Sequence, residues 1–288
     1  MRKIAIMTDS NSGITQDEAN KLGIFVVPMP FIIGGDIYFE GVNLSIDKFY
    51  EIQDSGKRIT TSQPNINEIV DKWKEILKEY DEIVHIPMSS GLSQSCETAT
   101  SFAENFEGKV QVVDNRRISI TQKGAVFDAV KMAKNGLSAL EIKKELEENA
   151  LQSSIYIMVD TLKYLKQGGR ITPAAAAIGT VLNIKPVLQI QGGKLDQYTK
   201  VMNVKSAKVK MIEGLKKDLE GRFAEFVKAG EMRISVAHTQ NDENAQIFAE
   251  ELKKNFPNVP IEYVDPLSLS VATHIGKKSL ACGCYRVY

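Results

Sequence analysis

Short apolar segments alternate with helix-like segments through the first half of this chain, and this alternation constrains the fold more than any other feature. Apolar runs at 82–87 and 109–113 are each followed by a helical run, at 92–105 and 118–134. An earlier strand-like run, at 3–7, begins the same order. Alternation of this kind predicts an α/β fold with a mainly parallel sheet that helices cover on both sides.

Local signals place further elements in this half of the chain. Thr15 and Glu18 have the spacing of a capping box, which predicts a short helix that ends at Leu22. The turn at 34–36 lies between two short apolar runs and predicts a small hairpin. Apolar residues at helical spacing predict an amphipathic helix over 65–80.

The pattern changes near residue 150, where we predict the boundary between two domains. Ser138 and Glu141 form a second capping box, and the helix that it opens should end close to this point. We therefore expect an N-terminal α/β domain over 1–150 and a smaller C-terminal α/β domain over 151–288. Strand–helix–strand pieces and a hairpin around Gly192 and Gly193 favour a mixed sheet in the second domain. Its expected helices cover 162–167, 173–182, 205–227 and 242–255, and its expected strands cover 155–159, 186–190, 194–201, 232–238 and 260–264.

Composition and charge exclude several classes of partner. The 288 residues include 36 basic and 36 acidic side chains, so there is no electrostatic argument for binding nucleic acid or an anionic membrane. No apolar run approaches the roughly 20 residues of a membrane span, so we expect no stable membrane insertion. An acid follows the first few apolar residues, and three cysteines give no disulfide framework, which together favour a cytoplasmic protein. Cys282 and Cys284 lack the spacing of a zinc turn and no nucleotide-binding glycine motif is present, so we predict no metal and no cofactor.

Two turns rich in hydroxyl groups are the strongest functional signal. Ser89 to Ser93 lies between a predicted strand and a predicted helix, and the cluster at 60–64 also leads into a helix. Unpaired backbone N–H groups and the helix dipole attract anions at such points, and hydroxyls can donate further hydrogen bonds. Because neither turn contains Lys or Arg, the pattern favours a site that holds a carboxylate or phosphate without a salt bridge. The plainer interpretation, that both turns are ordinary N-caps, fits the sequence equally well.

Three other residues are candidates for a polar site. His274, in a predicted loop near the end of the chain, could donate to a bound oxyanion, although a lone histidine is more often structural. Arg170 follows the Gly168-Gly169 turn and points either to solvent or toward a partner or ligand. Asp9 ends the first strand at its carboxyl end, where ligands of parallel sheets bind, or it caps a helix.

The segment from Gly91 to Ser95 permits a second class of function. It resembles the nucleophile elbow of serine hydrolases, G-x-S-x-G, but lacks the final glycine. A hydrolase or acyltransferase would use Ser93 as its nucleophile and His274 as its base, with an acid behind the histidine.

Together these segments resemble the DegV family of bacterial two-domain lipid-binding proteins. The resemblance spans nearly the whole chain and rests on five short segments in the order of the family: Asp9-Ser10, Thr61-Ser62-Gln63-Pro64, Ser89-Ser90-Gly91-Leu92-Ser93, Gly168-Gly169-Arg170-Ile171 and His274-Ile275-Gly276. It implies two α/β domains with the ligand between and beneath them. Asn11 stands where the family often has threonine, and Lys277-Lys278 where it usually has proline. We expect Asn11 to change only a cap, and the lysines to change the loop near His274.

The resemblance also implies a function. The protein would hold a long-chain fatty acid in a buried tunnel and present its carboxylate to a separate kinase subunit for acyl-phosphate formation, so that the chain itself is a binding subunit and not an enzyme. The implied carboxylate-binding residues are Thr61, Ser62, Ser93 and His274. Further implied contacts, to ligand or partner, are Ser90, Gly91 and Arg170, the last through its match to an arginine linked to docking of the kinase. The serine hydrolase and a carrier of a different amphiphile, such as an isoprenoid acid, remain as alternatives.

Overall fold

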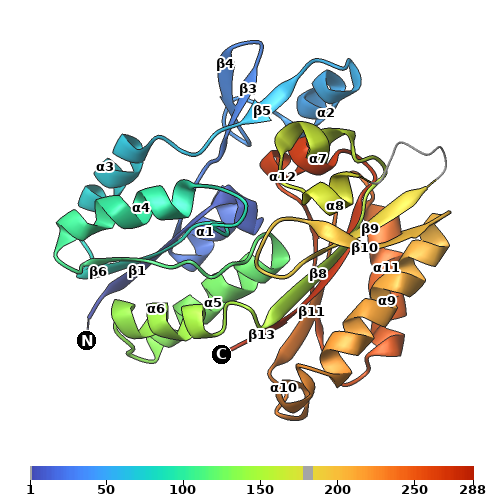
Figure 1. The fold of residues 1–288 in the computed structure, drawn as a ribbon. Coiled ribbons are helices and arrows are strands. Elements are labelled where there is room, and N and C mark those ends of the chain that lie inside the picture. Colours follow the sequence, from blue (N-terminus) through green and yellow to red (C-terminus); the bar gives the residue numbers. More distant parts are fainter. Residues whose placement is uncertain (1, 178–183) are drawn as a thin grey trace.

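The first domain is built on a parallel four-stranded sheet (Figure 1). The computed structural model, which describes residues 2–177 and 184–288, gives the strand order β2-β1-β6-β7. Because all four strands are parallel, their carboxyl ends lie at one end of the sheet, where ligands of such sheets bind. The bounds of the strands are Ile4–Asp9 (β1), Ile24–Val27 (β2), Glu82–Ile86 (β6) and Val110–Val112 (β7).

Helices cover both faces of this sheet. Successive residues of β1 point to opposite faces, so Met7 packs with Trp73 on one side and Ile6 packs with Ala125 on the other. The expected α/β class with a parallel sheet is thus confirmed. The helices on the Trp73 side are α3 (Ile66–Ile76) and α4 (Ser95–Ala103), and those on the other side are α1 (Gln16–Leu22), α5 (Ile120–Lys134) and α6 (Ala139–Glu148).

The second domain contains a mixed six-stranded sheet in the order β10-β9-β8-β13-β11-β12, as expected for a separate α/β domain. Neighbouring strands are antiparallel except β11 and β12, which are parallel. Long helices pack on one face, and the other face turns toward the first domain (Figure 1). The strands are β8 (Ser153–Met158), β9 (Lys185–Ile190), β10 (Asp196–Val201), β11 (Met232–His238), β12 (Ile261–Pro266) and β13 (Leu280–Arg286). The helices are α7 (Lys163–Gly168), α8 (Pro173–Ala176), α9 (Val204–Glu220), α10 (Ala224–Lys228), α11 (Asp242–Asn255) and α12 (Leu269–Ile275).

A third, three-stranded antiparallel sheet lies at the top of Figure 1. The hairpin predicted around 34–36 is present as β3 (Pro30–Ile33) and β4 (Asp36–Phe39). Its third strand, β5 (Ile59–Thr61), corrects the prediction of a turn at 60–64 that leads directly into a helix, since Thr60 and Thr61 pair with β3 and the N-cap of α3 is Asn65. Helix α2 (Ile46–Asp54) has no counterpart in the sequence prediction.

Several helix ends differ from the expected ones. Helix α4 begins at Ser95 and not at 92, because residues 89–93 form a turn of their own. The expected helix over 205–227 is divided into α9 and α10 near Gly221. Residues 178–182 of the helix expected at 173–182 lie outside the described residues. His274 belongs to α12 rather than to a loop.

The two predicted capping boxes and the predicted strand with two cysteines are present. Both capping boxes form, at Thr15 with Glu18 and at Ser138 with Glu141. Cys282 and Cys284 are buried in β13. Within the described ranges, no helix combines the length and apolar character needed to cross a membrane, and no cluster of metal-binding side chains occurs there.

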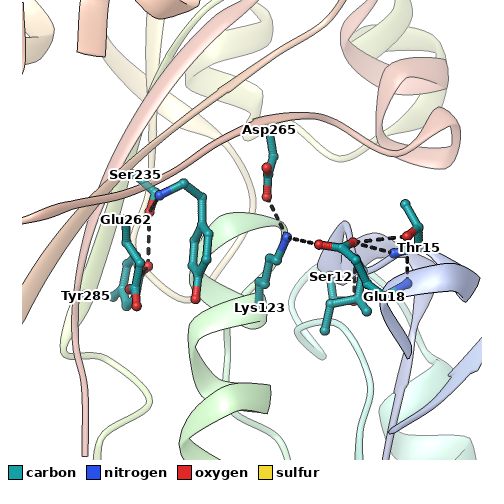
Figure 2. A network of polar contacts seen from close by, with 10 residues as sticks. Ser12, Thr15, Glu18, Lys123, Ser235, Glu262, Asp265 and Tyr285 are labelled. Carbon is teal, nitrogen blue, oxygen red and sulfur yellow. Dashed lines mark hydrogen bonds and ion pairs between the residues drawn. The ribbon is translucent and has the colours of Figure 1, made fainter. Parts of the chain in front are cut away.

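A buried lysine joins the two domains. Lys123 on α5 donates to Glu18 of α1 at 3.1 Å and to Asp265 of β12 at 2.8 Å, while 4% of its side chain is exposed. Figure 2 shows the ammonium group between these carboxylates, which come from opposite sides of the interface. Between α6 and β8 the chain crosses over through residues 149–152. The boundary near residue 150 falls in this turn and stays a prediction.

Candidate ligand-binding site

A largely apolar cavity lies between the two domains. Its empty volume, including the open mouth, is about 830 Å³. The first domain and the second domain both contribute to its wall, so the cavity depends on their association. Apolar lining residues include Met29, Met88, Leu92, Ile118, Ile120, Ile155, Ile157, Ala237, Leu267 and Ala281. Such a wall favours a ligand with a long hydrocarbon part, because burial of apolar surface drives its binding.

The structure brings five of the predicted site residues to this cavity. They are Thr61, Ser62, Ser93, Arg170 and His274. The Thr61 hydroxyl and Nε2 of His274 are 2.8 Å apart, which joins β5 to α12 across the mouth. Arg170 lies close enough to His274 to influence its pKa, and it contacts the backbone next to Ser93. These contacts connect Thr61, His274 and Arg170 into one polar group beside Ser93.

His274 is held in its neutral form. Burial is the main cause that lowers the pKa of its imidazole to about 4, and the positive charge of Arg170 lowers it further. A neutral imidazole has one donor and one acceptor nitrogen. The ring therefore contributes a hydrogen bond to the site near neutral pH, and not a second positive charge.

Ser93 belongs to a hydrogen-bonded turn and not to the helix itself. Its hydroxyl accepts from the Ser95 amide at 3.2 Å, and its own amide donates to the Ser89 carbonyl at 3.2 Å. The N-cap residue of α4 is Gln94, whose side chain makes no capping bond. The turn therefore fixes the Ser93 hydroxyl at the cavity wall, where its proton can be donated to an acceptor.

The turn contains two further predicted contact residues, Ser90 and Gly91, and both make contacts within the fold. The Ser90 hydroxyl donates to Asp114 at 2.5 Å. A Cβ at Gly91 would lie 2.9 Å from the Gly193 Cα, so only glycine lets the turn approach the β9–β10 hairpin this closely. In the described part of the chain both residues lie outside the cavity lining. Their expected contact with ligand or partner remains a prediction.

Arg170 introduces a charge that the hydroxyl-rich turns do not indicate. Its Nε donates to the Leu92 carbonyl at 3.3 Å and its Nη1 donates to the Gly168 carbonyl. These bonds hold the half-buried guanidinium at the cavity lining. A basic side chain from outside both turns therefore reaches the same cavity, while the expectation of an anion held without a salt bridge remains a prediction.

The geometry disfavours a serine hydrolase. A base for Ser93 would have to bond its hydroxyl, whereas Nε2 of His274 bonds Thr61. The charged side chain that shifts the His274 pKa is Arg170, a cation, while a catalytic triad places a carboxylate behind the histidine.

Comparisons with known proteins agree with this architecture. The family model described as "Uncharacterised protein, DegV family" matches residues 3–287. The chain belongs to the DegV family. It is 32% identical over 289 residues to Protein DegV of Bacillus subtilis, a match that covers 98% of this chain and 99% of that protein.

Solved DegV structures have the same fold. A DegV family protein from Thermus thermophilus, described by its fatty-acid binding, superimposes with a TM-score of 0.88 at 28% identity and covers all of both chains. DegV of Bacillus subtilis, described as a fatty acid binding protein, gives a TM-score of 0.84 at 30% identity and covers 99% of this chain and 100% of that one.

The two departures from the DegV pattern have structural consequences. Asn11 does more than change a cap, because its side chain lines the cavity, accepts from the Ser270 hydroxyl and donates to the Met88 sulfur at 3.0 Å. That expectation is therefore wrong. Lys277 pairs with Asp54 of α2, which ties the segment after His274 to the small third sheet region.

Sequence reasoning missed four polar residues of the DegV cavity, namely Asn11, Gln63, Ser119 and Ser270. Asn11 is expected only to change a cap, and a serine before a helix, such as Ser119, is typical of an N-cap. Neither pattern reveals that the side chain lines a cavity, because the facing walls come from other parts of the chain.

Proposed function

We propose that this protein binds a long-chain fatty acid in the cavity between its domains and presents the carboxylate to a separate kinase subunit. The observation that carries the proposal is the combination of a largely apolar cavity with one polar group of hydroxyls, a neutral imidazole and an arginine. Fatty-acid binding by its relatives from Thermus thermophilus and Bacillus subtilis supports it.

The energetics of binding favour a ligand whose apolar chain supplies the affinity and whose carboxylate is oriented by the polar group. A C16 acyl chain has about 15 CH₂ or CH₃ groups, and burial of each stabilises the complex by about 0.8 kcal/mol, or about 12 kcal/mol in all. Loss of translational, rotational and chain freedom removes several kcal/mol of this. The apolar wall can therefore supply the affinity. Thr61, Ser93 and His274 would then orient the carboxylate.

The proposed reaction takes place at the carboxylate. One carboxylate oxygen attacks the γ-phosphorus of ATP held by the kinase, the bond from that phosphorus to the bridging oxygen breaks, and ADP leaves. Hydroxyl donors such as Thr61 and Ser93 leave the carboxylate more nucleophilic than a bidentate arginine would. Arg170 donates two of its N–H groups to backbone carbonyls, which limits how fully it can neutralise the ligand.

Lipid extraction tests the proposal. The protein is purified under mild conditions, extracted with solvent and analysed by mass spectrometry, and the delipidated protein is titrated with hexadecanoic acid. We expect a copurified fatty acid and saturable binding in a 1:1 ratio. Absence of lipid in the extract together with no binding on titration would sink the proposal. An extract dominated by another amphiphile would favour the alternative carrier.

A further inference from the structure

The wall of the cavity carries a second polar cluster besides the one at the mouth. It consists of Asn11, Ser119 and Ser270, whose exposed fractions are 2%, 7% and 4%. Asn11 accepts from Ser270 through its side-chain oxygen, and the backbone carbonyl of Asn11 accepts from the Ser119 amide at 3.0 Å. The three residues therefore lie together, although they come from the short 3-10 turn after β1, the start of α5 and α12.

Ser119 is the unusual member of this cluster. Its backbone has φ +56° and ψ −135°, a conformation that suits glycine and strains other residues. It is the N-cap residue of α5, but its side chain makes no capping bond. Glycine is the usual residue for this backbone conformation, and serine at an N-cap usually bonds the helix through its hydroxyl. Ser119 follows neither pattern.

The cluster has unused hydrogen-bonding capacity. Among the described residues the Ser119 hydroxyl has no hydrogen-bond partner, although the residue is more than nine-tenths buried and lines the cavity. The Asn11 amide group donates to the Met88 sulfur, a weak acceptor, and also interacts with the buried Asp9 carboxylate, so the unused capacity lies in the Ser119 hydroxyl. A hydroxyl that faces an apolar cavity without a protein partner can be satisfied by an oxygen atom on the ligand.

The cluster also lies near the proposed carboxylate site. Ser270 and His274 are four residues apart on α12, so their Cβ atoms are about 5–6 Å apart on one side of the helix. A ligand whose carboxylate contacts His274 would pass the cluster within its first few carbons. The oxygen that fits is therefore a substituent close to the carboxyl end, and not one at the far end of the chain.

We propose that this cluster binds the hydroxyl group of a hydroxy fatty acid, with the hydroxyl on one of the first carbons after the carboxylate. The Ser119 hydroxyl bonds the ligand oxygen, beside the Asn11 and Ser270 side chains, which bond each other. The start of α5, where backbone N–H groups lack partners within the helix, favours the same oxygen. This inference rests on the proposed function, because the carboxylate site sets the position of the chain.

Paired titrations of delipidated protein test the inference. Dissociation constants are measured for hexadecanoic acid, for each enantiomer of 3-hydroxyhexadecanoic acid, and for 16-hydroxyhexadecanoic acid. An unpaired hydroxyl in an apolar cavity weakens binding by about tenfold or more. We expect one 3-hydroxy enantiomer to bind within about threefold of hexadecanoic acid, while the 16-hydroxy acid shows the full loss.

Two variants at one position separate the hydroxyl from the backbone strain. Ser119→Ala keeps the strained backbone and Ser119→Gly relieves it, but both remove the hydroxyl. For each variant we compare the dissociation constant of the better-binding 3-hydroxyhexadecanoic acid with that of hexadecanoic acid, and this ratio should rise about tenfold. The control Ser101→Ala, at an exposed serine of α4, should leave the ratio unchanged. Ser119→Gly should melt no lower than the wild type, which keeps the test valid if Ser119→Ala folds poorly.

The outcomes distinguish this inference from the proposed function. A tenfold loss for both 3-hydroxy enantiomers with the wild type, as an ordered water alone in the cluster would give, overturns the hydroxyl site. So does a ratio that neither Ser119 variant changes. Failure of hexadecanoic acid itself to bind overturns the proposed function instead.

Discussion

The electrostatics of the cavity depend on the side chains at its mouth, including His274. The protonation state of His274 can be tested directly. Burial lowers its pKa to about 4 from 6.5. Between these values the unfolded chain binds more protons than the folded one, so the free energy of unfolding falls by about 1.4 kcal/mol per unit as the pH drops. His274→Gln removes this contribution. From pH 7 to pH 5 the free energy of unfolding of the variant should therefore fall by about 2 kcal/mol less than that of the wild type. Urea unfolding of the delipidated wild type and variant at pH 7 and pH 5 measures these free energies. An equal decrease in the two proteins would contradict a buried neutral imidazole.

Ser93 separates affinity from presentation of the carboxylate. Its hydroxyl is one donor at the end of a ligand whose apolar chain supplies most of the binding energy, so Ser93→Ala should weaken fatty-acid binding by at most about tenfold, the value of one hydrogen bond. Phosphorylation of the bound acid by the kinase should fall by a larger factor, because the carboxylate loses its orientation. Titration and a single-turnover assay give the two factors, with Ser101→Ala as the control. Equal factors would count against this division of roles.

The register of three neighbouring strands determines how much space the cavity has for the acyl chain. Across three neighbouring strands, Ile157 of β8 pairs with Ala281 of β13, which pairs with Ala237 of β11, and all three line the cavity. Side chains in such a row point to one face of the sheet. Two alanines beside an isoleucine therefore leave a hollow into which a hydrocarbon fits.

Filling that hollow should change the preferred chain length. Ala237→Leu adds three carbons to the cavity wall, so a saturated C18 acid should lose about 2 kcal/mol, the burial of about three methylene groups. A C12 acid, which needs less room, should lose about 0.5 kcal/mol or less. Competition titrations with acids of graded length on the same variant cancel any general effect on folding. A uniform loss at all lengths would show that Ala237 does not limit the chain.

Over the whole molecule, the sequence is informative about local structure and much less so about the cavity. Thr15 and Glu18 predict their helix start because a capping box involves residues three apart. Strand β5 escapes prediction because its pairing partner, β3, lies almost thirty residues earlier. The Thr61–His274 contact joins residues 213 positions apart. Only the family resemblance, and not periodicity or spacing, brought these two residues into one predicted site.

Lys123 provides a test of how the two domains are held around the cavity. Lys123→Met keeps an unbranched side chain, one atom shorter, but removes the charge that Glu18 and Asp265 share. Breaking a buried pair costs about 3–5 kcal/mol when a charge is left buried. Here both carboxylates are partly exposed, at 41% and 26%, so we expect a smaller loss of stability, about 1–3 kcal/mol.

The matched control is Lys253→Met, which removes an exposed pair with Glu250 on α11 and should change stability by less than about 0.5 kcal/mol. Because Lys123 bridges the domains, its loss should also speed hydrogen exchange in α1 and β12 and shorten the lifetime of the fatty-acid complex, whereas Lys253→Met should do neither. Denaturant unfolding, hydrogen exchange and ligand-release kinetics on the same three proteins give the answer. A destabilised Lys123→Met protein with unchanged exchange and release would mean that the ion pairs stabilise the fold without holding the cavity closed.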